Sequence, residues 1–343
     1  MTDFEIPEWP YAFGGPSGNG DIKTIPDDFF VEEILSFQPE GSGEHVFLFI
    51  EKIGENTEYI ARILARYAGV RQRDVSFAGL KDRHGRTRQW FSVWLPGKQE
   101  PDWSILESDR LKILQTIRHA RKLKRGVLAG NHFELLIRNL ETRQEALEQQ
   151  LQQIKIQGFP NYFGEQRFGR NGNNIHSALA MFDGKRVKPE QRSIYLSATR
   201  AFLFNQILAE RVKQQTWNHA VPGDVLQLNL SHSFFAAPSP DQIIDKRISA
   251  GDIHPTGALY GKGDCGLSDS ELAIERCLFD LYPVLTNGLI KAGLVADRRS
   301  LRCIPEQFSW HFTPESHLKL GFHLPAGSYA TSLIREIVRT PTC

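Results

Sequence analysis

The stretch that decides the fold is Phe77-Ala-Gly-Leu-Lys-Asp-Arg-His-Gly-Arg-Thr-Arg-Gln89. Apolar runs typical of strands lie on both sides of it, at Val75–Ala78 and Gln89–Leu95. The polar, glycine-containing residues Gly79–Arg88 between these runs predict a loop. Asp82 is therefore expected on a loop held between two strands, a common position for catalytic groups.

Asp82 has two interpretations by residue type alone. Asp82-Arg83-His84-Gly85 places Asp and Gly where a type I turn prefers them, and aspartates in such turns are usually structural. The neighbouring basic side chains, in contrast, would keep a partly buried carboxylate ionised, as a nucleophile requires. The residues themselves leave both interpretations open.

Apolar periodicity predicts further elements along the chain. In order, we expect a strand at Val46–Ile50, a helix at Thr57–Ala68, a strand at His132–Arg138, a helix from a capping box at Thr142–Glu145 to Gly158, and a helix near Ser197–Gln214. Because glycine recurs in it, His254–Asp269 is predicted to be mostly irregular.

Positive charge is concentrated although the net charge is only +1. The segment from Arg71 to Lys98 contains seven basic and two acidic residues. The segment from Arg118 to Arg138 contains six basic residues and one acidic residue. A surface that follows phosphates and stacks on bases combines such charge with aromatic rings. The rings interspersed here are Trp90, Phe91, Trp94 and Phe133. A solvated face beside a core strand explains the same residues equally well.

Length and composition indicate a folded protein of more than one domain. The 343 residues exceed the roughly 250 at which one core usually stops growing. No apolar run approaches the roughly 20 residues of a membrane span, and the first residues lack a secretory signal, so we expect a cytoplasmic protein with no membrane association. The four cysteines form no C-x-x-C pair and are expected to be free thiols.

Motifs for nucleotide, zinc and serine-hydrolase chemistry are missing from the sequence. It contains no P-loop, G-x-G-x-x-G, H-E-x-x-H or G-x-S-x-G, and its histidines show no metal-ligand spacing. A reaction is therefore expected to use side chains alone, with no metal and no cofactor.

The stretch around Asp82 resembles the G-x-K-D-x-x-x-x-T-x-Q signature of the TruD family of pseudouridine synthases, whose aspartate is catalytic. Five further blocks resemble the family in the same order: Lys23–Glu33, Gly130–Phe133, Gly158–Gly169, Leu196–Asn205 and Leu324–Ser332. Together they span nearly the whole chain. One departure is Tyr329, where the family is expected to have Phe; the change keeps the ring and adds a hydroxyl that needs water or a partner.

The resemblance implies an α+β fold with a mixed, largely antiparallel pseudouridine-synthase sheet and flanking helices. An inserted α/β domain, the TRUD domain, would interrupt it and form the other wall of an RNA cleft. We place the first part of the catalytic domain in 1–157, the inserted domain in 158–303 and the returning catalytic segment in 304–343.

The resemblance also implies a reaction and a partner. Uridine in transfer RNA, with uridine 13 expected from the family, would be isomerised to pseudouridine with Asp82 as the catalytic nucleophile. The carboxylate would act at the sugar C1′, at the C2′ proton or at the base C6, and the sequence does not choose among these. No cofactor and no protein partner are implied.

Family position suggests how the substrate is held. An extruded base needs aromatic faces, for which Phe29, Phe133 and Tyr329 are candidates, although buried core rings are the ordinary alternative. Asn131 offers an amide for the polar edge of uracil, and Lys23 is expected to pair with Asp82 and lower its pKa. The basic residues expected to contact RNA are Lys81, Arg83, Arg86, Arg121, Lys122 and Lys124.

Two other functions compete with this one. The same scaffold could serve a non-catalytic RNA-binding protein, which would bind without releasing the C5 hydrogen. A glycoside hydrolase would need a second carboxylate near Asp82, and the sequence identifies none.

Overall fold

The computed structural model describes residues 5–231, 233–263 and 272–340. The chain forms two compact units. The sheet unit comprises Gly18–Thr142, Pro305–Gly327 and the residues from Arg339 onward, and the helix-rich unit comprises the residues up to Ser17 together with Arg143–Ile304 and Ser328–Val338. The assignment of catalytic and inserted roles to 1–157, 158–303 and 304–343 stays a prediction.

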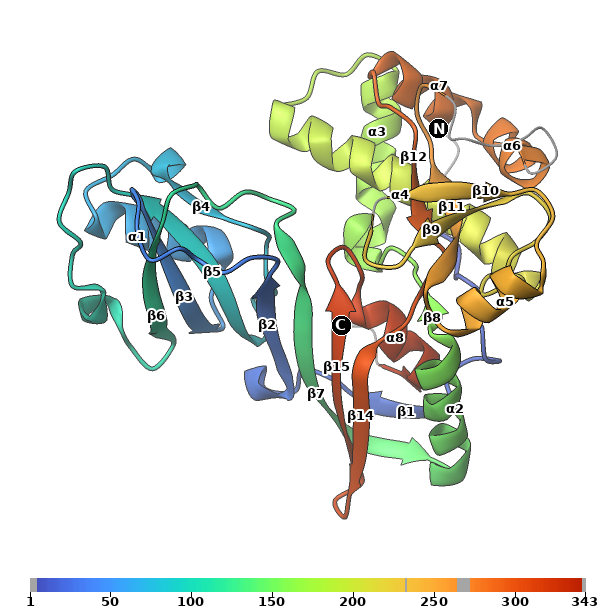
Figure 1. Cartoon of the computed structure of the whole chain (residues 1–343), viewed down its shortest axis with the longest axis horizontal. Coiled ribbons are helices and arrows are strands. Elements are labelled where there is room, and N and C mark those ends of the chain that lie inside the picture. Colours follow the sequence, from blue (N-terminus) through green and yellow to red (C-terminus); the bar gives the residue numbers. More distant parts are fainter. Residues whose placement is uncertain (1–4, 232, 264–271, 341–343) are drawn as a thin grey trace. The chain divides into compact units, whose positions relative to one another are not determined.

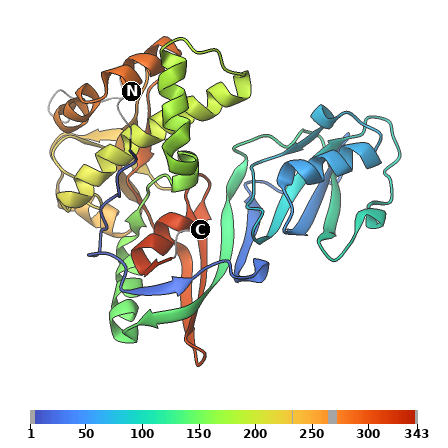
Figure 2. The ribbon, with the colours of Figure 1, turned by 180° about the vertical axis from the view of Figure 1, so that it is seen from behind.

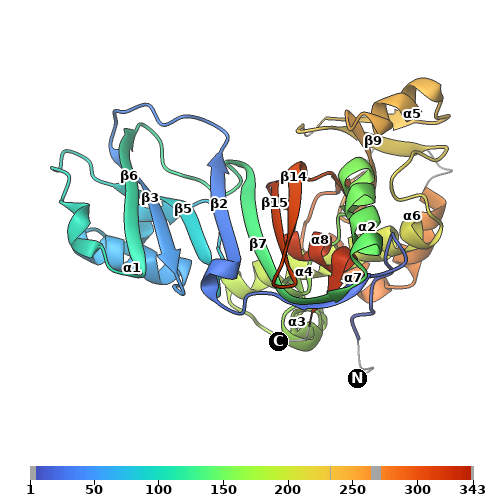
Figure 3. The same ribbon diagram turned by 90° about the horizontal axis from the view of Figure 1, so that it is seen from below.

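The sheet unit is built on a path of seven strands in the order β14-β15-β7-β2-β5-β3-β6 (Figures 1 and 3). Neighbours are antiparallel except β2 and β5, which are parallel. This confirms the mixed, largely antiparallel sheet. The strands are β2 (Phe29–Leu35), β3 (His45–Ile53), β5 (Arg86–Trp94), β6 (Leu111–His119), β7 (Leu128–Thr142), β14 (Glu306–Thr313) and β15 (His317–Pro325), with β1 (Gly18–Asp21) added to β7 and β4 (Val75–Phe77) to β5.

One helix, α1 (Thr57–Tyr67), covers part of this sheet. Its apolar stripe, which includes Ile60 and Leu64, shares a core with Leu48 of β3 and Phe91 of β5. The helix predicted at Thr57–Ala68 is confirmed, because apolar residues at helical spacing form its buried face.

Three strand predictions were too short. β3, predicted at Val46–Ile50, runs from His45 to Ile53. β5 begins at Arg86 rather than Gln89, because Arg86, Thr87 and Arg88 pair with Phe30, Val31 and Glu32 of β2 as well as with β3. β7 runs well beyond the predicted His132–Arg138, since β2 and β15 both pair with its first part and β1 pairs with its last residues, from Arg138 to Thr142. Pairing with neighbouring strands is tertiary information that local periodicity does not carry.

The helix-rich unit combines helices with a small antiparallel sheet of order β10-β9-β11-β12. Its strands are β9 (Asp224–Leu228), β10 (Phe234–Ala237), β11 (Ile253–Leu259) and β12 (Asp297–Ser300), and β8 (Phe159–Pro160) pairs separately with β13 (Arg302–Cys303). The helices are α2 (Gln144–Gln157), α3 (Asn173–Phe182), α4 (Pro189–Lys213), α5 (Gln242–Ser249), α6 (Leu272–Asp280), α7 (Pro283–Lys291) and α8 (Ala330–Ile337), after which β16 (Val338–Arg339) follows. α3 packs against α4, as Figures 1 and 2 show.

Short 3-10 turns join these elements: Pro26–Asp28, Gln72–Asp74, Trp103–Leu106, Glu165–Arg167 and Arg170–Gly172. The helix predicted to end at Gly158 does so, with Gly158 at φ 78°, but its N-cap is Arg143 instead of Thr142.

Among the described residues no helix is both long and apolar enough to cross a membrane. Cys277 and Cys303 are free thiols as predicted, and Cys265 and Cys343 lie outside the described residues.

The predicted irregular stretch at His254–Asp269 was wrong in its first part, because Ile253–Leu259 forms the buried strand β11. Gly257 allows close packing in this strand, because a Cβ at this position would lie 3.0 Å from Leu301 Cδ2 and 3.2 Å from Phe204 Cε2. Residues 260–263 form no helix or named strand, as predicted, and residues 264–269 lie outside the described residues. α4 also begins at Pro189, earlier than the predicted Ser197.

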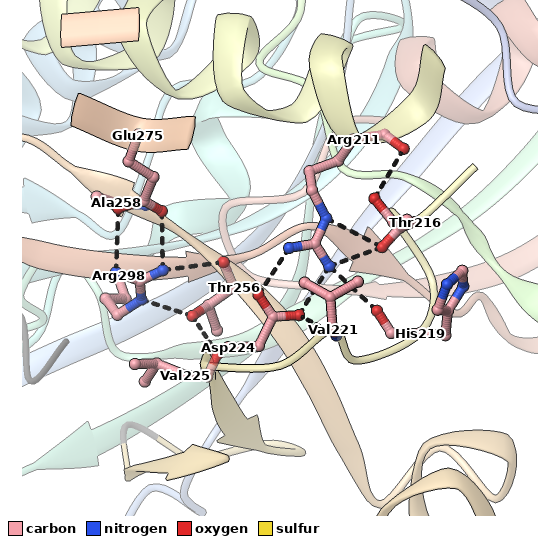
Figure 4. A network of polar contacts seen from close by, with 10 residues as sticks. All are labelled: Arg211, Thr216, His219, Val221, Asp224, Val225, Thr256, Ala258, Glu275 and Arg298. Atoms are coloured by element: carbon pink, nitrogen blue, oxygen red, sulfur yellow. Dashed lines mark hydrogen bonds and ion pairs between the residues drawn. The ribbon is translucent and has the colours of Figure 1, made fainter. Parts of the chain in front are cut away.

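Two buried arginines in the helix-rich unit, Arg211 and Arg298, are neutralised by carboxylates (Figure 4). Arg211 of α4 binds both carboxylate oxygens of Asp224, at 2.6 and 2.7 Å. Arg298 of β12 binds Glu275 of α6 at 2.9 Å. Each pair connects two elements and places a counter-charge beside a guanidinium that burial would otherwise make costly.

The N-terminal residues belong to the helix-rich core, which sequence patterns did not predict. Trp9 is buried and stacks on Tyr162, with ring centroids 5.9 Å apart. On α8, Arg335 donates to the carbonyls of Trp9 and Pro10, and Glu336 accepts a hydrogen bond of 2.9 Å from the backbone nitrogen of Ala12.

Candidate active site

The loop between β4 and β5 is held by buried polar side chains. Gln89 donates from Nε2 to the carbonyl of Gly79 over 3.2 Å. The hydroxyl of Thr57, at the start of α1, donates to Gln89 Oε1 at 2.8 Å and accepts from the backbone nitrogen of Lys81 at 3.1 Å. Since Thr57 and Gln89 are both buried, the loop backbone has fixed partners on a rigid scaffold.

Lys81 pairs with Glu33 of β2. Its Nζ lies 2.6 Å from Glu33 Oε1, and the side chains are 10% and 0% exposed. Glu33 Oε2 accepts a 2.9 Å hydrogen bond from the backbone nitrogen of Trp90. Burial raises the pKa of Glu33, although Lys81 acts in the opposite direction. Lys81 was predicted to contact RNA, but this placement favours a role in fixing the loop.

Asp82 lies on this loop with its side chain 22% exposed. Its Oδ2 accepts a hydrogen bond from Lys23 Nζ, so the predicted Lys23–Asp82 pair is confirmed. Its Oδ1 accepts a 2.9 Å bond from the backbone nitrogen of His84, the local bond that a turn aspartate makes. Asp82 therefore closes the turn and also keeps a partly exposed carboxylate.

Electrostatics favour the ionised form of Asp82. Burial by itself raises the pKa, but the hydrogen bonds from Lys23 and His84 and the charge of Lys23 outweigh it, so the pKa lies below its ordinary value. This is the expected effect of donors and a cation directed at a carboxylate.

Lys23 lies between Asp82 and an aromatic ring. Its Nζ is 4.2 Å from the ring centroid of Phe29, and its backbone adopts a left-handed conformation, with φ 58°. Phe29 contacts the ring of Phe133 edge-on at 6.3 Å, and Phe133 stacks on Phe322 at 5.2 Å. Phe29 and Phe133 are 5% and 7% exposed, so both rings also serve as core residues.

A second lysine lies beneath the loop. Lys52 of β3 is fully buried and donates to the carbonyls of Glu55 at 2.7 Å and Asp82 at 3.4 Å. Burial, together with the charge of Lys81, lowers the pKa of Lys52 to about 8. Lys52 was not among the residues predicted for the site; the available signal was a lysine two residues after the apolar run Val46–Ile50.

Asn131 of β7 lies opposite Glu33 of β2 in the strand register. Its Oδ1 is buried and has no hydrogen-bond partner among the residues that the structure describes. Buried carbonyl oxygens are usually satisfied, so a free one is suited to accept an N–H group from a ligand.

The other predicted RNA contacts are mostly on the surface. Arg83 of the loop is exposed, whereas Arg86 is half-buried, with Nη1 3.3 Å from Asp27 Oδ1 and its guanidinium 5.0 Å from the ring of Phe30. The second basic segment lies between β6 and β7 and exposes Arg121, Lys122 and Lys124. Lys122 reaches the carbonyl of Arg73 at 2.8 Å, which connects the two basic stretches.

Most of the aromatic side chains interspersed in the two basic stretches belong to the hydrophobic core. Phe91 is fully buried and Trp90 is 8% exposed, whereas Trp94 is 37% exposed. Phe91 therefore cannot stack on a base, and the alternative of a charged face beside core strands describes β5 better.

Tyr329 lies in the helix-rich unit, just before α8. Its hydroxyl accepts hydrogen bonds from Arg167, at 3.1 Å from Nε and 2.5 Å from Nη2. Phe163 contacts the ring edge-on at 6.0 Å. The hydroxyl thus has the partner that the sequence analysis expected it to need. Arg167 was visible in the block Gly158–Gly169, but nothing in the sequence assigned its role.

Among the described residues, no group of three or more His, Cys, Asp or Glu side chains could hold a metal ion.

Known proteins match this chain over ranges that include the six sequence blocks described above. The chain matches the family described as tRNA pseudouridine synthase D (TruD) over residues 8–184 and 171–337. It is 46% identical to tRNA pseudouridine synthase D of Methylococcus capsulatus over 331 residues, covering 96% of this chain and 94% of that one. It is 41% identical to the protein of the same name from Hydrogenovibrio crunogenus over 334 residues, with 97% and 96% covered.

A crystal structure assigned to tRNA pseudouridine synthase D from Methanosarcina mazei has a similar fold. Its TM-score is 0.70 at 22% identity, with 96% of this chain and 95% of that chain covered.

Proposed function

This chain belongs to the tRNA pseudouridine synthase D (TruD) family, and on that premise we propose that it isomerises uridine to pseudouridine in transfer RNA with Asp82 as the catalytic nucleophile. The observation that carries the assignment to Asp82 is its environment. The carboxylate is ionised, partly exposed and held on both oxygens by Lys23 and His84. Nucleophilic carboxylates need this combination of charge, fixed geometry and access.

The reaction exchanges one bond of uracil for another. The N1–C1′ bond breaks, the base turns, a C5–C1′ bond forms, C5 loses its hydrogen and N1 gains one. Asp82 would act at C1′, at the C2′ proton or at C6. Lys23 would keep the carboxylate ionised and in one rotamer before attack.

The base must leave the RNA stack, at a cost of a few kcal/mol, before Asp82 can reach it. We propose that Phe29 takes part in receiving the extruded base, with Phe133 supporting Phe29 from behind. For Tyr329, which belongs to the helix-rich unit, a contact with the substrate RNA is proposed separately, from its family position. The unpartnered Oδ1 of Asn131 supports a further role, since it can accept the N3–H of uracil.

Transfer RNA is the proposed partner, and an enzyme with that substrate is expected in the cytoplasm. Arg83, Arg121, Lys122 and Lys124 are exposed and would contact its phosphates. Arg86 and Lys81, which pair with Asp27 and Glu33, would act mainly by holding the loop.

Release of tritium from transfer RNA labelled at C5 of uridine tests this function. The purified protein should release it from a transcript with uridine at position 13 and not from one with cytidine there. Release from both transcripts would contradict the choice of uridine 13. Tight binding without release from either would support the non-catalytic alternative. Glu33 cannot serve as the second carboxylate that a glycoside hydrolase would need, because its side chain is 0% exposed and cannot reach a substrate.

A further inference from the structure

Two arginines of the helix-rich unit lie against one ring. The guanidinium carbons of Arg167 and Arg299 are 5.8 and 4.2 Å from the ring centroid of Phe163. Neither arginine has a carboxylate within ion-pair distance among the residues that the structure describes. Two guanidinium groups therefore lie against the ring of Phe163 with no carboxylate beside them among the described residues.

Other buried arginines of the unit are of two kinds. Arg211 and Arg298 are each neutralised by a carboxylate, Asp224 or Glu275 (Figure 4). Arg302 donates instead to neutral acceptors among the described residues, His254 Nδ1 and the carbonyls of Ile248 and Ile253.

The arrangement at Phe163 differs from both kinds because two guanidinium groups lie against one ring. Arg299 has no carboxylate partner, and burial, with the charge of Arg167 acting in the same direction, lowers its pKa to about 10. Keeping two like charges close together is costly, which indicates that an anion from outside the chain completes the cluster.

Neutral groups hold both guanidinium groups in place. Arg167 donates to the hydroxyls of Tyr329 and, over 3.2 Å, of Ser197. Arg299 donates to Asn161 Oδ1 at 2.6 Å and to the Asn161 carbonyl at 3.2 Å. These acceptors fix orientation and leave the charge uncompensated. Rigid planar donors of this kind match a phosphate, and the Ser197 hydroxyl can donate to the same group.

We propose that Arg167, Arg299 and Ser197 bind one phosphodiester of the substrate RNA, and that the hydroxyl of Tyr329 orients Arg167 for this contact. The inference rests on the proposed function only in taking RNA as the ligand. It gives the Tyr329 hydroxyl, present where the family is expected to have Phe, a function beyond that of the ring.

Equilibrium binding of transfer RNA at 50 to 200 mM salt tests the proposal. Loss of one phosphate contact in Arg167→Gln or Arg299→Gln should reduce the slope of log K against log salt by about 0.7 to 0.9. Across this range affinity would then fall about threefold less than in the wild type. Arg167→Lys keeps the charge and should keep the slope while binding more weakly, because the planar fork is lost.

Arg170→Gln is the matched control, because Arg170 is exposed and follows Arg167 by three residues. It should change the slope less than Arg167→Gln does. Equal changes in the two variants would overturn the proposal, since any surface charge would then suffice. An unchanged slope in Arg167→Gln together with reduced turnover would also overturn it, by showing that Arg167 only supports Tyr329.

Tyr329→Phe gives a second measurement that does not alter charge. It should leave the salt slope unchanged and weaken binding severalfold, and unchanged affinity would contradict the orienting role. Binding at equilibrium does not depend on which carboxylate performs the chemistry, so these results stand apart from any failure of the Asp82 assignment.

Discussion

Lys81 and Glu33 form a buried ion pair, with Lys81 Nζ 2.6 Å from Glu33 Oε1. The two residues belong to separate sequence blocks, the signature around Asp82 and the block that begins at Lys23. Because β2 and β5 are parallel neighbours, the strand that carries Glu33 lies beside the strand that follows the loop. The pair therefore fixes the loop one residue before Asp82.

Breaking this pair should destabilise the protein strongly. Lys81→Met leaves Glu33 buried without its partner, which typically costs about 3–5 kcal/mol. The double variant Lys81→Met with Glu33→Gln should recover much of that loss, because no unpaired charge remains. Urea unfolding of both single variants and the double variant measures the coupling. A loss below about 1 kcal/mol in Lys81→Met would show that the pair contributes little.

Lys23 should set the acid limit of activity. It helps hold the pKa of Asp82 below its ordinary value, so the wild-type carboxylate stays ionised as the pH falls. Lys23→Met should shift the acid limb of single-turnover kcat/KM to higher pH, and Lys23→Arg, which keeps the charge, should shift it less. An acid limb that does not move in Lys23→Met would separate Lys23 from the ionisation of Asp82.

Lys52 should make stability depend on alkaline pH. Its pKa is about 8 in the folded protein against an ordinary value of 10.5, so the unfolded chain binds more protons between these values. Stability should therefore rise from pH 8 to 10.5, by at most about 3 kcal/mol, and be lost as the pH falls back through 8. Lys52→Met should lack this rise in denaturant titrations at several pH values. An equal rise in the variant would assign the dependence to other groups.

Glu336 should act in the opposite sense. Burial raises its pKa to about 7 from an ordinary value of 4.5, so the folded chain binds more protons in between. Its contribution to stability is present below pH 4.5 and is lost as the pH rises to about 7. Glu336→Gln keeps an acceptor for the backbone nitrogen of Ala12 and should raise Tm at pH 8 while hardly changing it at pH 5. A lower Tm at pH 8 would mean that the charge itself is needed beside Arg335.

Local patterns predicted the elements whose apolar residues are buried in a regular way. Thr57–Ala68 was found because its apolar stripe meets one core, and Val46–Ile50 because its continuous apolar run is covered by a core on each face. The patterns failed where pairing with a neighbouring strand determines the secondary structure. Arg86–Arg88 look like loop residues and are strand because β2 pairs with them, and Gly257 lies in a strand because β12 pairs with it, opposite Arg299.

The candidate site was predictable to a similar degree. The Lys23–Asp82 pair followed from family position. The partners of Lys81 and the burial of Lys52 did not, because they depend on which strands become neighbours. The pairing of Tyr329 with Arg167 joins residues 162 positions apart, and the extra hydroxyl was the one local hint that a donor had to be there.

The most direct test of the central claim is a single-turnover tritium-release measurement on Asp82→Asn with C5-labelled transfer RNA. Asn keeps an acceptor for the backbone nitrogen of His84 but has no charge and is a poor nucleophile, so transfer RNA should bind with near-normal Kd while release falls by at least about a thousandfold. Release at a rate near that of the wild type would contradict Asp82 as the catalytic carboxylate.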